Sequence, residues 1–223
     1  MTLAVILARA NSKGIKNKNL ALLGGKPLLY YTITAAQEAY GIDEIVCSSD
    51  GEEILEYAST HAIQTLKRPS ILASDTVRSD EALLHVLEHF RGFDTFILLQ
   101  PTSPLRTAIH ITKALELFYQ GDYTTLISVF RTNKEILKSF ILDEDGNLKG
   151  ICNNTYPFMP RQALPDVFMS NGAIYISKTS FFKKHQSFLS PKTAHYEMSQ
   201  NSSVDINEQC DLLKAQEFLV RGY

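Results

Sequence analysis

The stretch LAVILARANSKGIKNKNL, from Leu3 to Leu20, joins two very different kinds of sequence. Its opening run, LAVIL, is apolar and rich in branched side chains, which predicts a buried β-strand. The loop that follows, ARANSKGIKNKN, holds four cations, three asparagines, one glycine and no acidic residue. Because the formal net charge of the whole chain is -2, this positive charge is a local feature.

Strand-like and helix-like segments alternate along the chain after this first strand. Further strands are predicted at 44–50, 63–68, 95–100 and 124–130. Helices are predicted at 26–40, 52–62, 79–90 and 109–120. This alternation predicts an α/β fold, a mostly parallel sheet with helices on both faces. A last strand at 171–177 and a helical tail at 207–220 complete the pattern.

The pattern is interrupted between about Arg131 and Ser170. Two short strand-like runs surround Asp145 and Gly146, a pair typical of a hairpin turn. The proline-rich run YPFMPRQALP follows and shows no helical or strand period. We therefore predict a single domain with an inserted arm at about 131–170.

Composition excludes several classes of protein. A length of 223 residues with 44% apolar residues suffices for one sizeable core. The near-neutral charge argues against nucleic-acid or membrane binding, and no apolar run reaches the roughly 18 residues that span a bilayer. Three scattered cysteines without a CxxC pair suit a reducing cytoplasm and indicate neither disulfides nor a zinc site.

The basic loop is the first candidate for a ligand site. Open parallel sheets bind ligands at the carboxyl ends of their strands, where this loop lies. Its cations and the backbone N–H groups around Gly14 suit a polyphosphate. The spacing matches neither GxGxxG nor a GKS or GKT phosphate loop. On charge alone, a solvated lysine-rich loop is an equally good interpretation.

A series of motifs decides between these interpretations. ILARANSKGIKNKNL, GKPLLYYTI, SSD, RPSILASD, LLQPTSPLR, PFMPRQALP, MSNGAIYI and SVDI occur in this order. Together they resemble the bacterial CMP-sialic acid synthetases, or acylneuraminate cytidylyltransferases, over essentially the whole chain. The resemblance implies a Rossmann-like nucleotidyltransferase fold in one domain, 1–223, whose arm serves dimerisation. The family pattern runs to the end of the sequence, so no phosphatase extension is expected.

The resemblance assigns the nucleotide site. The basic loop would hold the triphosphate of CTP through Arg9, Lys13 and Lys18, with Asn19 as the closing residue of the motif. Arg9 and Lys18 would also act in catalysis, by stabilising the charge that moves onto leaving pyrophosphate.

The resemblance places Arg68 and Ser79 at the cytosine and ribose pocket. An arginine suits the O2 and N3 acceptors of cytosine. From the residues alone, the favoured interpretation is instead an Arg68 in a surface ion pair and a Ser79 that caps a helix.

Two segments would bind the sugar. In LLQPTSPLR, the prolines stiffen a loop that carries Gln100, Thr102, Ser103 and Arg106, although a plain strand-ending turn is the alternative. The resemblance turns Gln100 and Thr102 toward the sugar or the reacting phosphate. The resemblance adds Arg161, Gln162 and Asn171 in PRQALPDVFMSNGAIYI, and Lys138, a residue that the arm lends to the second subunit of a homodimer. A further family arginine is Met169 in this chain.

The run SVDINEQCD departs from the family. Relatives have DID, whose two carboxylates are associated with the catalytic Mg²⁺ (or Mn²⁺), whereas this chain has Asp205 and Asn207. An asparagine carbonyl can still bind Mg²⁺, without charge. Asp205, or a water that it holds, is also the candidate general base. Asp211 matches a further family acid or only caps the last helix.

His85 and His89 lie four residues apart, but no third ligand is evident.

The function that the resemblance implies is an enzyme, a nucleotidyltransferase that uses CTP to activate N-acetylneuraminic acid or a similar nine-carbon 2-keto sugar acid. The product, a CMP-sugar, would serve the synthesis of a glycan such as lipopolysaccharide or capsule. Two alternatives stay open: legionaminic acid or 3-deoxy-octulosonic acid as the substrate, and a non-catalytic nucleotide-sugar-binding protein.

Overall fold

The computed structural model describes residues 1–11, 14–73 and 79–221. Internal contacts divide the chain into two compact units. The first comprises Met1–Val129 and Ser170–Tyr223, and the second comprises Phe130–Met169. The second unit covers nearly the range in which the arm was expected, and its role in dimerisation stays a prediction.

Within the described residues, the main sheet has seven strands in the order β11-β7-β10-β6-β1-β4-β5. Their bounds are β1 Thr2–Leu7, β4 Glu44–Ser49, β5 Gln64–Lys67, β6 Thr95–Leu99, β7 Thr125–Thr132, β10 Val167–Lys178 and β11 Thr193–Glu197. β1 pairs in parallel with β4 and β6, β4 with β5, and β11 with β7, whereas β10 is antiparallel to β6. The predicted mostly parallel sheet is confirmed.

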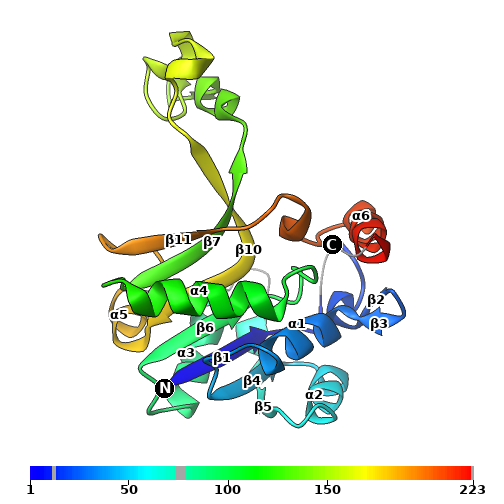
Figure 1. Cartoon of the computed structure of the whole chain (residues 1–223). Coiled ribbons are helices and arrows are strands. Elements are labelled where there is room, and N and C mark those ends of the chain that lie inside the picture. The colour runs from blue at the N-terminus through cyan, green and yellow to red at the C-terminus, as the bar shows by residue number, and fades with distance from the viewer. Residues whose placement is uncertain (12–13, 74–78, 222–223) are drawn as a thin grey trace. The chain divides into compact units, whose positions relative to one another are not determined.

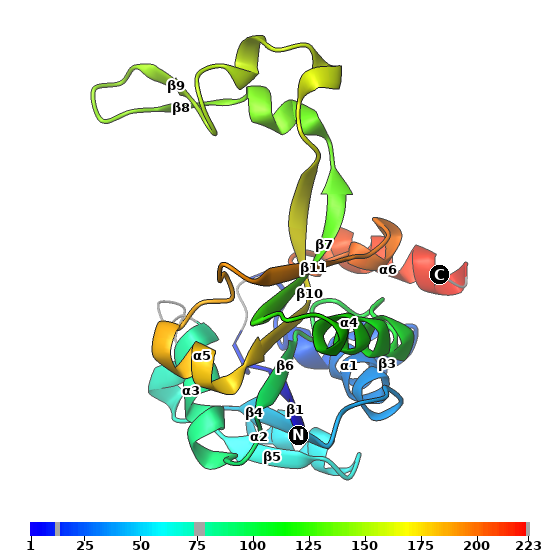
Figure 2. The ribbon, with the colours of Figure 1, turned by 60° about the vertical axis from the view of Figure 1, so that its left-hand side comes forward.

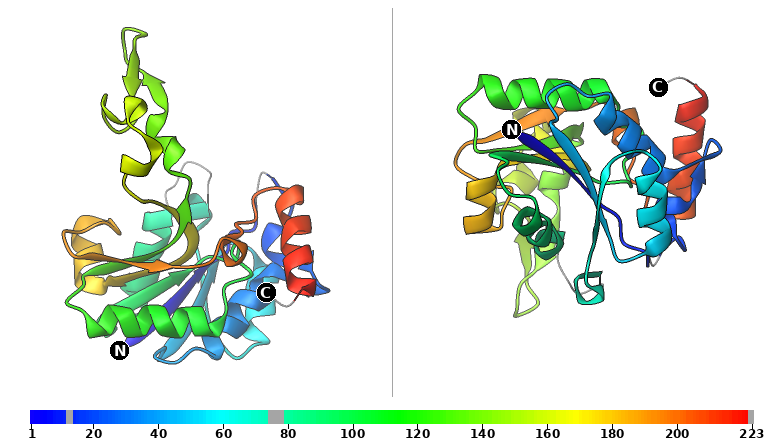
Figure 3. Two further views of the ribbon diagram at one scale, coloured as in Figure 1. Left: turned by 45° about the horizontal axis from the view of Figure 1, so that its top comes forward. Right: turned by 90° about the horizontal axis from the view of Figure 1, so that it is seen from below.

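Helices cover both faces of this sheet (Figures 1 and 3). The alternating residues of β1 explain this: Ala4 and Ile6 pack into one cluster, Leu3 and Val5 into another, and all are fully buried. The first cluster includes residues of α1 (Leu28–Gln37), α2 (Glu52–Ser59) and α4 (Ala108–Gln120). The second includes residues of α3 (Ser79–His89) and α5 (Thr179–His185). None of the helices in the described part of the chain is long and apolar enough to cross a membrane.

A third apolar cluster fixes the C-terminal helix α6 (Gln209–Val220) beside the basic loop. It joins Leu23 and Leu28 to Leu105, Val204, Ile206 and Ala215. Leu23 lies in the small β2–β3 hairpin (Leu22–Leu23 and Lys26–Pro27), and Leu105 lies in the loop after β6. This packing brings the segment before α6 next to the carboxyl ends of β1 and β6.

The second unit contains a hairpin of β8 (Phe140–Leu142) and β9 (Leu148–Gly150), seen in Figure 2. Asp143 Oδ1 accepts the backbone N–H groups of Asp145 and Asn147 at 3.1 and 2.8 Å, and Gly146 takes the left-handed conformation with φ at 81°. The hairpin predicted from Asp145 and Gly146 is therefore present. Three short 3₁₀ turns complete the unit: η3 Lys134–Lys138, η4 Tyr156–Phe158 and η5 Arg161–Ala163.

Candidate active site

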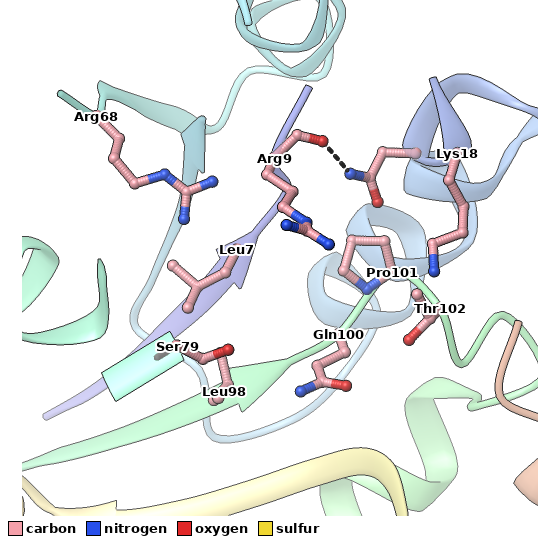
Figure 4. Close-up of a pocket in the computed structure, with 10 residues that line it drawn as sticks. Leu7, Arg9, Lys18, Arg68, Ser79, Leu98, Gln100, Pro101 and Thr102 are labelled. Atoms are coloured by element: carbon pink, nitrogen blue, oxygen red, sulfur yellow. Dashed lines mark hydrogen bonds between the residues drawn. The ribbon is translucent and has the colours of Figure 1, made fainter. Parts of the chain in front are cut away.

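A cleft opens at the carboxyl ends of β1 and β6 (Figure 4). Its walls come from the loop after β1, the residue after β5, the start of α3 and the loop after β6. The lining residues are Leu7, Arg9, Lys18, Asn19, Arg68, Ser79, Leu98, Gln100, Pro101 and Thr102. The fold thus brings together seven of the residues predicted from the sequence, which are Arg9, Lys18, Asn19, Arg68, Ser79, Gln100 and Thr102.

The basic loop closes on itself through Asn19. The side-chain Nδ2 of Asn19 donates to the backbone oxygen of Arg9 at 2.8 Å, the dashed line in Figure 4. Asn19 is buried, so this bond fixes the base of the loop and leaves the Arg9 side chain at the cleft. Lys13 lies outside the described residues.

Lys18 begins the 3₁₀ turn η1 (Lys18–Leu20) and is tethered to the segment before α6. Its Nζ donates to the backbone oxygen of Ile206 at 2.9 Å. Burial lowers the pKa of Lys18, and the carboxylate of Asp205 offsets this in part. The ammonium group therefore lies half-buried between the basic loop and Asp205.

Arg68 is buried, with 5% of its side chain exposed, and its NH2 lies 3.7 Å from Asp50 Oδ1. Within the described part of the chain, its Nε and NH2 have no hydrogen-bond partner. Burial lowers the pKa of Arg68, and Asp50 opposes this. The interpretation as a surface ion pair is therefore wrong. Ser79 is exposed, lines the cleft and is the first residue of α3.

Arg106 fixes the loop after β6 and does not point to a substrate. Its NH1 donates to the backbone oxygens of Gln100 and Ala173 at 3.1 and 3.0 Å, and its NH2 donates to Thr32 Oγ1 at 2.6 Å. Complete burial lowers its pKa to about 9. Its grouping with the sugar-facing residues is therefore corrected: Arg106 positions the backbone that carries Gln100.

Asp205 is held beside this loop with one oxygen unused. The N–H of Ile206 donates to the Thr102 oxygen at 2.7 Å, and Asn207 Nδ2 donates to Asp205 Oδ2 at 2.9 Å. Asp205 Oδ1 is buried and has no hydrogen-bond partner among the described residues.

Gly172 allows the backbone of β10 to approach both Asp205 and Gln100. It has φ at 72°, and a Cβ added there would lie 3.1 Å from Gln100 Oε1 and 3.9 Å from Asp205 Oδ1. The lack of a side chain at Gly172 thus leaves room for a polar corner beside the cleft, formed by Gln100 and Asp205.

Comparison with known proteins now identifies the family. A family model described as cytidylyltransferase matches residues 3–216. The chain belongs to the cytidylyltransferase family. It is 33% identical over 210 residues to N-acylneuraminate cytidylyltransferase of Escherichia coli O18:K1:H7, covering 94% of this chain but 50% of that relative. It is also 32% identical to CMP-N,N'-diacetyllegionaminic acid synthase of Legionella pneumophila, covering 94% of this chain and 92% of the relative. The family expected from the motifs is confirmed.

A solved structure supports the fold. CMP:2-keto-3-deoxy-manno-octonic acid synthetase, complexed with CTP, superposes with a TM-score of 0.77 over 100% of this chain and 99% of its own, at 14% identity. This likeness confirms the predicted Rossmann-like α/β nucleotidyltransferase fold. The chain spans about half the length of the N-acylneuraminate cytidylyltransferases that it matches.

The donors at Asp205 fit a magnesium ion that takes most of its ligands elsewhere. The described residues contain no group of three His, Cys, Asp or Glu side chains that could hold a metal by themselves. The unpartnered Asp205 Oδ1 and the amide oxygen of Asn207 are hard oxygen donors. Mg²⁺ commonly binds through one or two protein oxygens, with phosphates and water as its other ligands.

Asp211 and the pair of His85 and His89 have structural roles. Asp211 Oδ2 accepts the N–H groups of Asn207 and Glu208, both at 2.9 Å. Asp211 therefore caps α6, which is one of the two roles considered for it from the sequence. His89 Nδ1 lies 2.8 Å from the backbone oxygen of His85, and the two rings pack with centroids 4.5 Å apart.

Asn171 is committed to the protein interior. Its Oδ1 accepts from Ser128 Oγ at 2.6 Å and from the Ala173 N–H at 3.1 Å. Its Nδ2 donates to Ser203 Oγ at 2.9 Å and contacts Met198 Sδ at 3.2 Å. Because every polar atom of this buried amide has a partner, we assign Asn171 a positioning role in place of the predicted sugar contact.

The other predicted sugar residues belong to the second unit. Lys138 is half-buried at the end of η3, and Arg161 and Gln162 are exposed in η5. Arg161 NH1 lies 3.8 Å from Glu135 Oε1. Met169 is 42% exposed. The sugar-binding roles of Lys138, Arg161 and Gln162 stay predictions.

Proposed function

We propose that this protein transfers CMP from CTP to the anomeric hydroxyl of a nine-carbon 2-keto sugar acid and releases pyrophosphate. The observation that carries this proposal is the cleft itself. It joins two cations of the basic loop, Arg9 and Lys18, to a buried guanidinium, Arg68, that has unused donors. Such a site can hold a polyphosphate at one end and a base with adjacent acceptors at the other.

Each residue has a defined task in this reaction. Arg9 and Lys18 bind the triphosphate and stabilise the charge that accumulates on departing pyrophosphate. Arg68 donates to the O2 and N3 atoms of cytosine. Gln100 and Thr102 orient the sugar, so that its hydroxyl reaches the α-phosphorus in line with the leaving group.

Asp205 Oδ1 and the side-chain oxygen of Asn207 would hold Mg²⁺ (or Mn²⁺). When bound, the ion supplies Lewis-acid neutralisation of the phosphate charge. Asp205 beside this cleft, or a water that it orients, would also accept the proton of the attacking hydroxyl.

The sugar is proposed to be N-acetylneuraminic acid or a close analogue. The relatives include an N-acylneuraminate cytidylyltransferase and a CMP-N,N'-diacetyllegionaminic acid synthase, so legionaminic acid is the second candidate. Met169 stands where the resembled family has an arginine, which supports an analogue with a different acyl pattern as the alternative substrate. We further propose a cytoplasmic location, because exposed free thiols at Cys152 and Cys210 suit a reducing compartment.

Pyrophosphate release with a panel of substrates tests this function. We expect release with CTP and at least one nine-carbon 2-keto sugar acid, and turnover with UTP, ATP or GTP far below that with CTP. The panel comprises N-acetylneuraminic, legionaminic and 3-deoxy-octulosonic acids. Binding of CTP without release for any sugar would favour a nucleotide-binding protein, and comparable turnover with UTP would remove the assignment of Arg68 to cytosine.

The second unit is proposed to pair two copies of the chain. In this unit, all of whose residues the structure describes, Gly150 and Leu164 are the buried ones. Large apolar side chains are exposed instead, including Leu142 at 68%, Leu148 at 71% and Phe158 at 82%. Exposed apolar side chains in such number on so small a unit are typical of an interface.

Sedimentation tests the dimer. Leu142 and Leu148 lie opposite each other in the β8–β9 hairpin, so the double substitution Leu142→Asp and Leu148→Asp should shift a homodimer to monomer. Leu189→Asp, which alters an equally exposed leucine of the first unit, is the control and should leave the dimer intact. A native protein that is monomeric and fully active at assay concentrations would contradict the proposal.

A further inference from the structure

Asp50 lies at the carboxyl end of β4, between the basic loop and Arg68. Its Oδ1 accepts the backbone N–H of Ala10 at 2.9 Å and also lies 3.7 Å from Arg68 NH2. One carboxylate oxygen therefore contacts both the loop that carries Arg9 and the guanidinium at the other side of the cleft. The sequence placed Asp50 only in the string SSD, without a role; its position directly after a strand was the available signal.

The surrounding backbone holds Asp50 in this place. The N–H of Arg68 donates to the Ser49 oxygen at 2.7 Å, and the N–H of Gly51 donates to Ser49 Oγ at 3.0 Å. A Cβ added to Gly51 would lie only 2.8 Å from the Cβ of Ala10. The segments around Ser49, Ala10 and Arg68 thus form a tightly packed junction, and the side chain of Asp50 is 13% exposed.

We propose that Asp50 is a positioning residue that orients Arg68 toward the base and so sets the preference for CTP over UTP. This inference rests on the proposed function. Cytosine presents O2 and N3 as adjacent acceptors, whereas uracil carries a hydrogen on N3. A guanidinium held in one orientation meets two acceptors in cytosine but faces a donor in uracil, and that mismatch discriminates. A guanidinium that can turn loses this selectivity.

The two contacts of Asp50 can be separated by substitution. Asp50→Asn keeps an oxygen acceptor for the Ala10 N–H but removes the charge that faces Arg68. Asp50→Ala removes both. We therefore expect Asp50→Asn to lower the ratio of CTP to UTP affinity by roughly tenfold. This is the effect of losing one hydrogen bond between the charged guanidinium of Arg68 and cytosine. Asp50→Ala should lower this ratio equally and also reduce the preference for CTP over CMP, because the basic loop loses its anchor.

Asp43→Asn is the matched control. Asp43 Oδ2 also accepts a backbone N–H, that of Thr2 at 2.5 Å, but Thr2 begins β1, whereas Ala10 follows the end of that strand. Its substitution should change neither ratio. Calorimetric binding of CTP, UTP and CMP to the full chain gives all the ratios without a sugar, and thermal melting reports the stability of each variant.

Arg68→Met provides an independent test. It should lower the CTP to UTP ratio as much as Asp50→Asn does, and Asp50→Asn added to Arg68→Met should cause no further fall. The proposal is overturned if Asp50→Asn melts earlier but keeps the native ratio, since Asp50 would then act on stability alone. It is also overturned if the two substitutions lower the ratio additively. A native chain that does not bind CTP would refute the proposed function itself, before any variant is compared.

Discussion

Replacing Asp205 with alanine is expected to lower the rate of pyrophosphate release on the order of 10³-fold at saturating CTP and sugar, because in the proposed site it would remove an anionic oxygen that holds the metal at the reacting phosphates. The structure gives this carboxylate a buried Oδ1 without a hydrogen-bond partner in the described part of the chain, and its other oxygen is held by Asn207. Asp43→Ala is the control: it removes a carboxylate that accepts the N–H of Thr2 at the start of β1, away from the cleft, so it should lower the melting temperature and leave the rate near the native value.

The companion variant is Asn207→Asp, which restores the second carboxylate of the family pattern. A second anionic oxygen should lower the Mg²⁺ concentration that gives half-maximal rate, because Mg²⁺ favours carboxylates. In the absence of CTP, Mn²⁺ binding followed by calorimetry should strengthen in the same direction. Identical Mg²⁺ titrations for the native protein and Asn207→Asp, together with an active Asp205→Ala, would mean that the metal is held by the triphosphate alone.

Much of the fold could be predicted because most of its strands and helices show their patterns within short stretches of the sequence. The apolar run of β1, buried from Thr2 to Ile6, and the alternation of strand and helix patterns after it directly predict parallel strands and crossover helices. β11 and α5 were not predicted. β11 is a short run, TAHYE, whose polar and partly exposed side chains carry no apolar period, and it pairs with β7, some 60 residues away in the sequence. The seven-residue α5 is too short to show a helical period.

The site was predictable to the extent that its residues follow strands. Arg9, Arg68 and Gln100 each come directly or nearly directly after a strand, so a parallel sheet places them at one edge. The roles of Asn171 and Arg106 were not predictable, because the sequence does not show whether a polar side chain faces a ligand or the protein interior. Only the tertiary partners, Ser128 and Ser203 for one and Thr32 for the other, reveal that both support the site from within.

These buried supports also explain how the cleft can present separate charges in fixed positions. The Arg106 guanidinium fixes the loop after β6, and the N–H of Ile206 ties that loop to the segment before α6. Lys18 links the basic loop to the same segment through its hydrogen bond to the Ile206 oxygen. Phosphoryl transfer depends on positioning and charge more than on covalent chemistry by the protein, so this linked backbone is the feature that the proposed reaction would require.

Lys18 is therefore the second residue whose loss should be severe. In the proposed site, Lys18→Met would remove a charge-assisted contact to the triphosphate, and we expect kcat/KM for CTP to fall by about 10²- to 10³-fold. Lys18→Arg keeps the charge and should retain more activity. A Lys18→Met protein with native kcat/KM and an unchanged melting temperature would place the triphosphate elsewhere.

The pH dependence gives this residue a second signature. Burial lowers the pKa of Lys18, so in the free protein the ammonium loses its proton at a lower pH than an ordinary lysine does. A neutral amine no longer attracts phosphate, and kcat/KM for CTP should fall as pH rises through that lowered pKa. Bound triphosphate favours the charged form and raises the pKa again, so kcat at saturating CTP should fall only at higher pH. In Lys18→Arg the guanidinium stays charged across this range, and the alkaline fall in kcat/KM should disappear; if it persists unchanged, another group causes it.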